Sequence, residues 1–414
     1  IDTSRILSSY PHQLSGGQKQ RIMIAMALLC KPKLLIADEP TTALDVTVQK
    51  EIIQLLKNLQ KKYAMSILFI SHDLTLVRQL ADKVWVMYQG EIVEEGNTET
   101  LFKKPKHHYT QGLLFARPKT NVRLDRLPTL EDYKKGAFKE IPISKITRQK
   151  QHKILYEKTP LLEVKGFEKT YIKRNWLGNN GKFKALHSLD FSLYPGETLG
   201  LVGESGCGKS TLAKALIYLD PPSQGSVSYK GKPIIQTTTS LRNLRKEIQF
   251  IFQDPYAALH PLKTIGSAIE EVLYVHGIAV SSKAQKERSQ QLLYQVNLAP
   301  SFYNRYPHEL SGGQRQRAVI ARALATEPKL LICDESVASL DISVQAQVLN
   351  LLNDLKKELG LSYLFISHDL AVVKYMSDRV MVMENGCLLE LQEADALYAT
   401  PKHPYTQKLI DAIP

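Results

Sequence analysis

The chain has 414 residues, of which 43% are hydrophobic and 23% charged, so it is long enough for two or three soluble domains with buried cores. No run approaches the roughly eighteen apolar residues of a membrane-spanning helix, which excludes a membrane pore built by this sequence alone. The four cysteines lie far apart without a C-x-x-C pair. A zinc site, an iron–sulfur cluster and a disulfide framework are therefore not expected, and a reducing compartment fits.

The net charge of +13 has a local component. Residues 119–158 hold eleven Lys and Arg against five Asp and Glu. Ordinary solubility charge together with a basic linker accounts for the excess, and proximity to anionic lipid is the second interpretation. Because no interleaved aromatic and basic pattern accompanies the charge, no nucleic-acid partner is expected.

An internal repeat organises the chain. Residues 10–118 align without a gap with residues 306–414: YPHQLSGGQKQR corresponds to YPHELSGGQRQR, and KLLIADEPTTALD to KLLICDESVASLD. The expected organisation is the C-terminal part of a first unit (1–118), a basic linker (119–160) without a site, and a complete second unit (161–414). We expect the sequence to be a fragment of a longer protein, because the first unit lacks the segments that precede the repeat in the second.

Apolar periodicity predicts the elements of the first unit. In chain order these are a helix from Ser15, a strand at 34–37, a helix at 46–60, a strand at 67–70 and a hairpin at 84–88 and 91–94. Because its central strand is missing, this unit is expected to expose a large apolar edge.

The sequence of the second unit predicts an α/β fold. Its expected elements are a strand at 161–167, a polar loop at 173–184, strands at 188–193, 198–202, 227–229 and 248–252, and a helical insertion at 265–297. Buried strands that alternate with helices predict a mostly parallel sheet with helices on both faces.

A phosphate-binding loop follows the strand at 198–202, as Gly203-x-x-x-x-Gly208-Lys209-Ser210. Its glycines let successive backbone N–H groups point at one anion, and the helix that begins at Lys209 adds its positive end. Lys209 is expected to reach the β- and γ-phosphates of a nucleoside triphosphate, and the Ser210 hydroxyl to bind Mg²⁺. The alternative, a plain glycine-rich turn, is disfavoured by the motif. The residues expected to contact the nucleotide are Gly203, Glu204, Ser205, Gly206, Cys207, Gly208, Lys209, Ser210 and Thr211.

Two carboxylates, Asp334 and Glu335, follow a second buried strand. Asp334 is placed to hold Mg²⁺ through water, facing Ser210, and Glu335 to orient and deprotonate the attacking water. A structural helix cap is the alternative, but it would not explain an apolar strand before both carboxylates.

With these residues in place, the chain resembles the nucleotide-binding subunits of ABC transporters over nearly its whole length. LSGGQ, the signature of that family, occurs twice, each time upstream of a D-E strand and a Ser-His-Asp turn. The resemblance implies a P-loop NTPase fold of ABC type with an inserted helical subdomain, present as a partial first cassette and a complete second one. It further implies that Tyr171 stacks on adenine, that Gln253 senses Mg²⁺ and the membrane partner, and that His368 contacts the γ-phosphate, so that Glu335, His368 and Gln253 form the catalytic set.

ATP sites of this family are shared between two cassettes, with the phosphate loop of one facing the signature of the other. The resemblance implies that the first signature closes the site of the second unit, with Asp45 across the same interface. The second signature has no loop to face here, so one complete ATP site and half of another are expected. The residues of the first signature are Ser15, Gly16, Gly17 and Gln18, and those of the second are Ser311, Gly312, Gly313 and Gln314.

Within the family, the likeness is to fused importers of oligopeptides, dipeptides and glutathione- or microcin-like peptides. It rests on FQDPYAALHP around Gln253 and on the tails PKHHYT and PKHPYT. This implies an ATPase that uses ATP and Mg²⁺ at the cytoplasmic face of the inner membrane, with two integral-membrane permease subunits and, indirectly, a periplasmic or extracellular substrate-binding protein. A cassette–cassette dimer within the full-length chain is also implied.

One departure from the pattern is Ser336 after Glu335, where the first unit has Pro40 after Glu39; hydrolysis is still expected. The cysteine ligands of some peptide importers are missing, so no iron–sulfur cluster is expected. Two other interpretations stay open: a soluble tandem-cassette protein acting on ribosomes or DNA, and a non-functional remnant. The tails and the absence of a long charged helical hairpin in the linker argue against the first.

Overall fold

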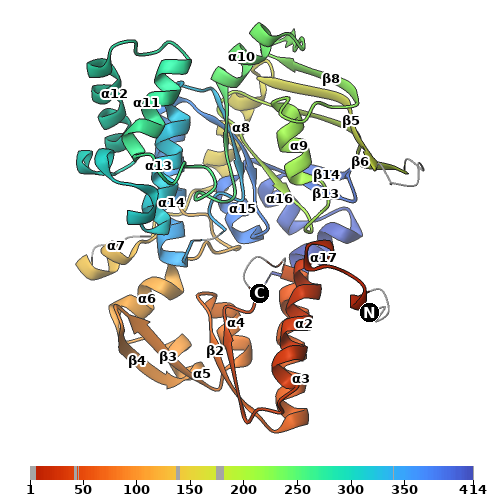
Figure 1. The fold of residues 1–414 in the computed structure, drawn as a ribbon, viewed down its shortest axis with the longest axis vertical. Helices are drawn as coiled ribbons and strands as arrows, with labels where there is room; N and C mark the ends of the chain where they lie inside the picture. The colour runs from red at the N-terminus through yellow and green to blue at the C-terminus, as the bar shows by residue number, and fades with distance from the viewer. Residues whose placement is uncertain are drawn as a thin grey trace.

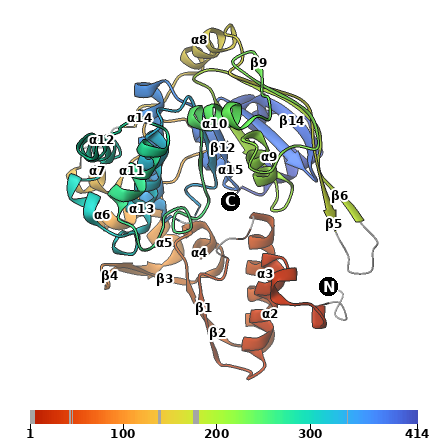
Figure 2. The same cartoon turned by 45° about the horizontal axis from the view of Figure 1, so that its top comes forward.

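The computed structural model describes residues 6–41, 44, 46–136, 140–173, 181–338 and 340–413. The first 118 residues form a smaller lobe, here called the first lobe, and residues from 161 onward form a larger second lobe (Figure 1). Residues 119–160, the connecting segment, link the two lobes, and their helix α8 (Lys145–Tyr156) lies on the second lobe, away from the first (Figure 2). In the described part of the chain, no helix is long and apolar enough to cross a bilayer.

The second lobe is built on a six-stranded sheet with the order β10-β11-β12-β7-β13-β14. Its strands are β7 (Thr198–Val202), β10 (Ile248–Ile251), β11 (Leu330–Asp334), β12 (Ser362–Ile366), β13 (Arg379–Glu384) and β14 (Cys387–Glu393). All neighbours pair in parallel except β13 and β14, which form an antiparallel hairpin. Every residue of β7, β11 and β12 is buried, because both faces of the sheet are covered. The prediction of a mostly parallel sheet is confirmed.

Helices cover this sheet, and two of them form the inserted helical part. The helices are α9 (Lys209–Leu216), α10 (Thr238–Glu247), α11 (Ile265–Val275), α12 (Ser282–Gln295), α13 (Gly312–Leu324), α14 (Ile342–Leu359), α15 (Leu370–Met376), α16 (Ala394–Ala399) and α17 (Pro404–Asp411), with short 3₁₀ turns η2 (Pro300–Asn304) and η3 (Pro307–Glu309). Helices α11 and α12 pack against each other and against α13, as the predicted insertion requires. Each begins at a hydroxyl cap: Thr264 accepts from the Ser267 N–H, and Ser281 from the Ala284 N–H.

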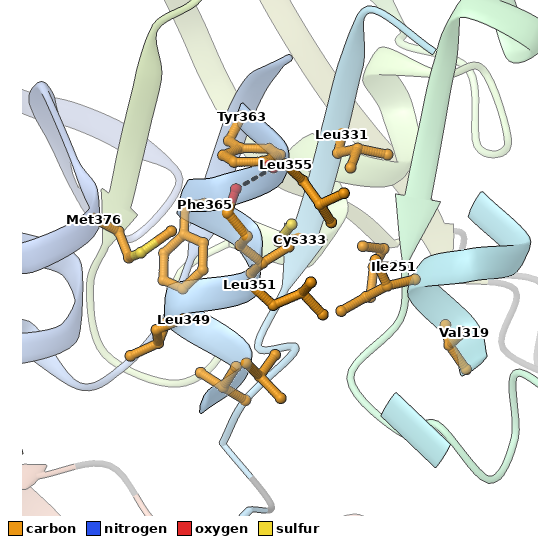
Figure 3. Packing of buried hydrophobic residues seen from close by; sticks show 14 of the residues in the cluster. Ile251, Val319, Leu331, Cys333, Leu349, Leu351, Leu355, Tyr363, Phe365 and Met376 are labelled. Carbon is orange, nitrogen blue, oxygen red and sulfur yellow. Dashed lines mark hydrogen bonds between the residues drawn. The ribbon is translucent and has the colours of Figure 1, made fainter. Parts of the chain in front are cut away.

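Two hydrophobic clusters lie on opposite faces of the parallel sheet. Along β11, Leu331 and Cys333 belong to one cluster and Leu330 to the other, because side chains alternate across a strand. Figure 3 shows the first cluster, where strand residues pack against side chains of α13 and α14. The buried Tyr363 hydroxyl donates to the Leu352 carbonyl at 2.7 Å, so this polar atom is satisfied inside the core.

A second, antiparallel sheet has the order β6-β5-β8-β9. Its strands are β5 (Leu162–Lys173), β6 (Gly181–Leu193), β8 (Gln224–Tyr229) and β9 (Lys232–Pro233). The prediction of a polar loop at 173–184 is wrong at its C-terminal end, because residues 181–184 belong to β6. The strand predicted from residue 188 therefore begins earlier, at Gly181. Pairs such as Thr170 with Lys184 and Lys173 with Gly181 continue the hairpin into polar sequence, since backbone pairing does not require apolar side chains.

The first lobe contains the elements that correspond to the C-terminal part of the second lobe. Its elements are η1 (Pro11–Gln13), α2 (Gly16–Leu28), β1 (Leu34–Asp38), α3 (Val46–Tyr63), β2 (Ser66–Ile70), α4 (Leu74–Leu80), β3 (Lys83–Tyr88), β4 (Glu91–Asn97), α5 (Thr98–Lys103) and α6 (His108–Phe115). In the second lobe β7 lies between β12 and β13, but the corresponding β2 and β3 of the first lobe belong to separate two-stranded sheets. Leu68 and Ile70 on β2 and Trp85 and Met87 on β3 are exposed, as expected of a sheet without its central strand.

The connecting segment is folded against the second lobe. It contains α7 (Leu130–Lys135) and α8 (Lys145–Tyr156). The Leu127 N–H donates to Asn350 Oδ1 and the Leu127 carbonyl accepts from Asn350 Nδ2, both at 2.9 Å. Buried Arg148 donates to the Ser377 carbonyl at 2.9 Å and pairs with Glu393 at 2.9 Å. Part of the basic charge of this segment therefore neutralises carboxylates of the second lobe.

Candidate nucleotide site

A cavity of about 500 Å³ opens beside the phosphate loop, which follows the carboxyl end of β7. Its volume is in the usual range for a site that holds a small molecule. The predicted residues that line it are Tyr171, Ser205, Gly206, Gly208, Lys209, Ser210, Thr211, Gln253, Glu335 and His368. These residues come from widely separated segments, so the fold assembles most of the predicted set in one place.

The phosphate loop has a backbone that requires glycine at two positions. Gly203 has φ +155°, and a Cβ there would lie 2.2 Å from the Met383 carbonyl oxygen. Gly208 has φ +107°, and a Cβ there would lie 2.9 Å from Leu186 Cδ2. Larger residues at either position would push the loop away from its neighbours, so the spacing of the motif follows from close packing as well as from anion binding.

Lys209 is held inside the loop. Its side chain is buried, and its Nζ donates to the carbonyl oxygens of Gly203 at 2.7 Å and Glu204 at 3.0 Å. The ammonium group is therefore already positioned at the centre of the loop, at the N-terminus of α9, where an anion is favoured.

Ser210 and Asp334 meet across the end of the sheet. The Ser210 hydroxyl donates to Asp334 Oδ1 at 3.1 Å. Burial raises the pKa of Asp334 above its ordinary value, although the Ser210 hydrogen bond opposes the shift. A buried carboxylate beside a hydroxyl is a hard oxygen donor set, of the kind that binds Mg²⁺. Among the described residues, no group of three or more His, Cys, Asp and Glu side chains is placed to hold a metal by itself.

Glu335 lies between Gln253 and His368. Gln253 Nε2 donates to Glu335 Oε2 at 2.7 Å, and His368 Nδ1 lies 3.6 Å from the same oxygen. The His368 side chain holds the pKa of Glu335 below its ordinary value, so the carboxylate is ionised at neutral pH. Burial would lower the pKa of His368, but the nearby Glu335 carboxylate raises it above its ordinary value. The two groups thus stabilise each other's charged forms.

The backbone of Glu335 is left-handed, with φ +49°. The corresponding Glu39 of the first lobe has φ +43°. Both N–H groups are fixed by a bond to the neighbouring strand, from Glu335 to the Ile366 carbonyl and from Glu39 to the Ile70 carbonyl, each at 2.9 Å. Non-glycine residues in this conformation are uncommon and cluster at functional sites.

Tyr171 stands on the cavity wall, on β5 next to Phe183 of β6. Its ring is 37% exposed and its hydroxyl donates to Asp220. An exposed aromatic face at the mouth of the cavity fits the predicted contact with a base, which stays a prediction.

The two signature sequences have the same local structure. Ser15 accepts from the Gln18 N–H at 3.3 Å while Gln18 Oε1 accepts from the Ser15 N–H at 2.9 Å, a reciprocal cap at the start of α2. Ser311 and Gln314 cap α13 in the same way. A Cβ on Gly17 would lie 2.6 Å from the side chain of Val48 on α3. This close approach of α2 and α3 requires glycine at position 17.

The trans arrangement of the first signature stays a prediction. From the first lobe, Leu44 reaches the described lining of the cavity, and Ser15–Gln18 do not. The predicted partner Asp45 lies outside the described residues.

Tyr405 is a contact that sequence reasoning missed. Its hydroxyl accepts from the Glu204 N–H of the phosphate loop at 3.0 Å. The PKHPYT tail is in turn fixed by buried Glu390, which accepts from the Lys402 and His403 N–H groups at 3.0 and 3.1 Å. The repeated tail motif was the available signal, but nothing in the sequence places it against the loop.

Tyr405→Phe is expected to weaken ATP binding about three- to fivefold with little change in kcat, because one hydrogen bond to the loop is worth roughly 1 kcal/mol. Calorimetric titration with ATP measures the change. Tyr294→Phe, at an exposed position, is the matched control. An unchanged dissociation constant for Tyr405→Phe would show that the tail does not support the loop.

Two family models match stretches of this sequence. The model described as "ABC transporter" matches residues 2–42 and 186–338, and the one described as "Oligopeptide/dipeptide transporter, C-terminal region" matches 93–142 and 389–414. Among solved structures, cbiO1 of Clostridium perfringens, part of an ABC transporter complex, has a TM-score of 0.51 at 26% identity and covers 59% of this chain and 92% of its own. A dimeric ATP-binding cassette bound to ADP and Pi has a TM-score of 0.50 at 28% identity, over 56% of this chain and 98% of its own.

The chain belongs to the ABC transporter family, as an ATP-binding protein with the ABC cassette fold. Two relatives define its branch: the glutathione import ATP-binding proteins GsiA of Salmonella paratyphi A and of Escherichia coli K12 are each 48% identical over the whole of this chain. Within the family it is of the oligopeptide/dipeptide importer type. The chain spans 66% of the length of these relatives.

Proposed function

We propose that this chain binds ATP in the cavity beside the phosphate loop and hydrolyses it to drive import of a peptide. The observation that carries the proposal is that Lys209, Ser210 and Glu335 line one cavity. The Ser210 hydroxyl donates to Asp334, and Gln253 donates to Glu335. Glutathione is named for the relatives, and a short peptide of that kind is the substrate class proposed here.

Each residue of the site has a separate role in the proposed hydrolysis. Lys209 and the loop N–H groups bind the phosphates, and the aromatic face of Tyr171 contacts the adenine. Glu335 is the general base for the attacking water, Gln253 orients its carboxylate, and His368 donates to the γ-phosphate. Positioning and charge neutralisation supply most of the rate enhancement in phosphoryl transfer, and this set provides both.

Mg²⁺ fits the donor set at Ser210 and Asp334. The Ser210 hydroxyl would bind the ion directly, and Asp334 and Gln253 would hold it through water. The ion would neutralise charge on the phosphate oxygens of ATP.

The first signature is proposed to complete the site from the first lobe. The α2 N-terminus and the Ser15 hydroxyl would then contact the γ-phosphate once the two lobes close on ATP. Asp45 is proposed at the same interface.

Ser15→Arg is therefore expected to lower ATP hydrolysis at least about tenfold, because a bulky cation replaces the cap that faces the phosphates. Steady-state ATPase assays of the intact protein measure it. Ser8→Arg, seven residues earlier in the exposed N-terminal stretch, is the charge-matched control. Full activity in the Ser15 variant would contradict a shared site.

Transport by the proposed mechanism requires partner proteins. We propose two integral-membrane subunits that receive the motion through the Gln253 region, a substrate-binding protein outside the membrane, and a position at the cytoplasmic face.

The test is ATP hydrolysis and peptide uptake measured together. Cells that lack the chromosomal copy are expected to regain uptake of radiolabelled glutathione or a dipeptide with the wild-type protein and not with Glu335→Gln. Hydrolysis without any peptide uptake would retain the ATPase and overturn the import proposal.

A further inference from the structure

Two equivalent loops lie near each other, one in each lobe. Residues 71–73 and 367–369 both read Ser-His-Asp and occupy the same positions of the repeat. In each, the aspartate caps the following helix: Asp73 accepts from the Thr75 N–H and Asp369 from the Ala371 N–H, both at 2.9 Å. A cavity of about 100 Å³ between the lobes is lined by residues of both loops.

One cation from the first lobe reaches both aspartates. Arg117 lies just beyond α6, with Nη1 3.6 Å from Asp73 Oδ1 and Nη2 3.7 Å from Asp369 Oδ2. Its Nη1 also donates to the Thr75 hydroxyl. The three side chains are about one-quarter exposed, so solvent screens this pairing only partly.

The repeat makes this contact asymmetric. The position of Arg117 corresponds to Ile413 in the second lobe. Ile413 packs against the hydrophobic cluster of that lobe, and its side chain is uncharged. The first lobe therefore supplies the bridging cation, and the second lobe has no counterpart to it at the equivalent position.

We propose that Arg117 is a positioning residue that ties the Ser-His-Asp loop of the catalytic site to the first lobe. Asp369 directly follows His368, whose imidazole lies 3.6 Å from Glu335. A guanidinium that fixes Asp369 also fixes the approach of His368 to the site, and Asp73 and Thr75 hold that guanidinium on the side of the first lobe. Hydrolysis in the second lobe is thereby coupled to the position of the first lobe. This inference rests on the proposed ATPase function.

Arg117→Met tests the coupling in the intact protein. We expect kcat for ATP to fall about five- to tenfold while KM changes less than twofold, because the contact positions the loop and does not bind ATP. Arg126→Met is the matched control: Arg126 also pairs across to the second lobe, with Asp354 at 3.2 Å, but lies on the exposed surface away from the loops. Arg117→Lys keeps a charge that reaches one aspartate at a time, so partial activity is expected.

Asp73→Asn supplies the decisive comparison, because Asp73 belongs to the lobe that does not hold the catalytic Glu335. The amide keeps the helix cap and removes the charge. It is expected to lower kcat about threefold in the wild type and to have no further effect in Arg117→Met. Equal effects of Asp73→Asn in both backgrounds, or an unchanged kcat in Arg117→Met, would overturn the proposal.

A second readout does not depend on hydrolysis. Amide hydrogen exchange at Thr75 and Ala371 is expected to speed up together in Arg117→Met and to stay unchanged in Arg126→Met. If the wild type hydrolyses no ATP, the proposed function fails while this measurement still decides the bridge. Unchanged exchange at both amides overturns the bridge even if the ATPase is active.

Discussion

Glu335→Gln is expected to lower the rate of ATP hydrolysis at least about 100-fold and to leave ATP affinity within about threefold of the wild type. The amide has the size of the carboxylate and can keep the contact with Gln253, but it cannot accept a proton from the attacking water. Steady-state phosphate release measures the rate, and ATP titration measures the affinity. The exposed Glu327→Gln is the control for a changed charge.

The same substitution has a second expected effect, on His368. The Glu335 carboxylate raises the pKa of that imidazole, so its removal should move the His368 titration to lower pH. Proton NMR of the imidazole signals follows the shift. A variant that still turns over at the wild-type rate would remove Glu335 from the mechanism, and an unmoved His368 titration would show that the two groups do not interact in solution.

Lys209→Met is expected to weaken ATP binding about 100-fold, equivalent to about 2.7 kcal/mol. The wild-type ammonium group is already fixed by the Gly203 and Glu204 carbonyl oxygens, so little order has to be created when the phosphates bind. Methionine fills similar volume and removes the charge. Calorimetric titration with ATP measures the loss.

Lys214→Met is the matched control for Lys209→Met, because Lys214 is an exposed lysine further along the same helix. It is expected to change the dissociation constant less than twofold. If both variants bind ATP equally well, the phosphates are not bound by this loop.

The parts of the site that are contiguous in sequence could be predicted from it. The phosphate loop needs glycine where the backbone is left-handed and a lysine at the helix start, and both requirements are local. The buried strand before Asp334 and Glu335 was recognisable because a strand covered on both faces has an uninterrupted apolar run.

Contacts made by distant segments could not be predicted in the same way. Nothing in the PKHPYT tail indicates that the Tyr405 hydroxyl meets the loop, and nothing around Leu44 indicates that it reaches the cavity. The hairpin of β5 and β6 runs further than its apolar residues because each strand is stabilised by its neighbour's backbone. The bridging role of Arg117 depends on the relative placement of two copies of a repeat.

The anchoring of the connecting segment limits how far the lobes can separate. Arg123 donates to the Tyr375 and Ser377 carbonyl oxygens of the second lobe, only eight residues after α6 ends at Phe115. Fully extended, that stretch spans about 28 Å. Such a short tether keeps the facing surfaces at an effective concentration of the order of millimolar. Reassembly after each opening is then an intramolecular step, whose rate is independent of protein concentration.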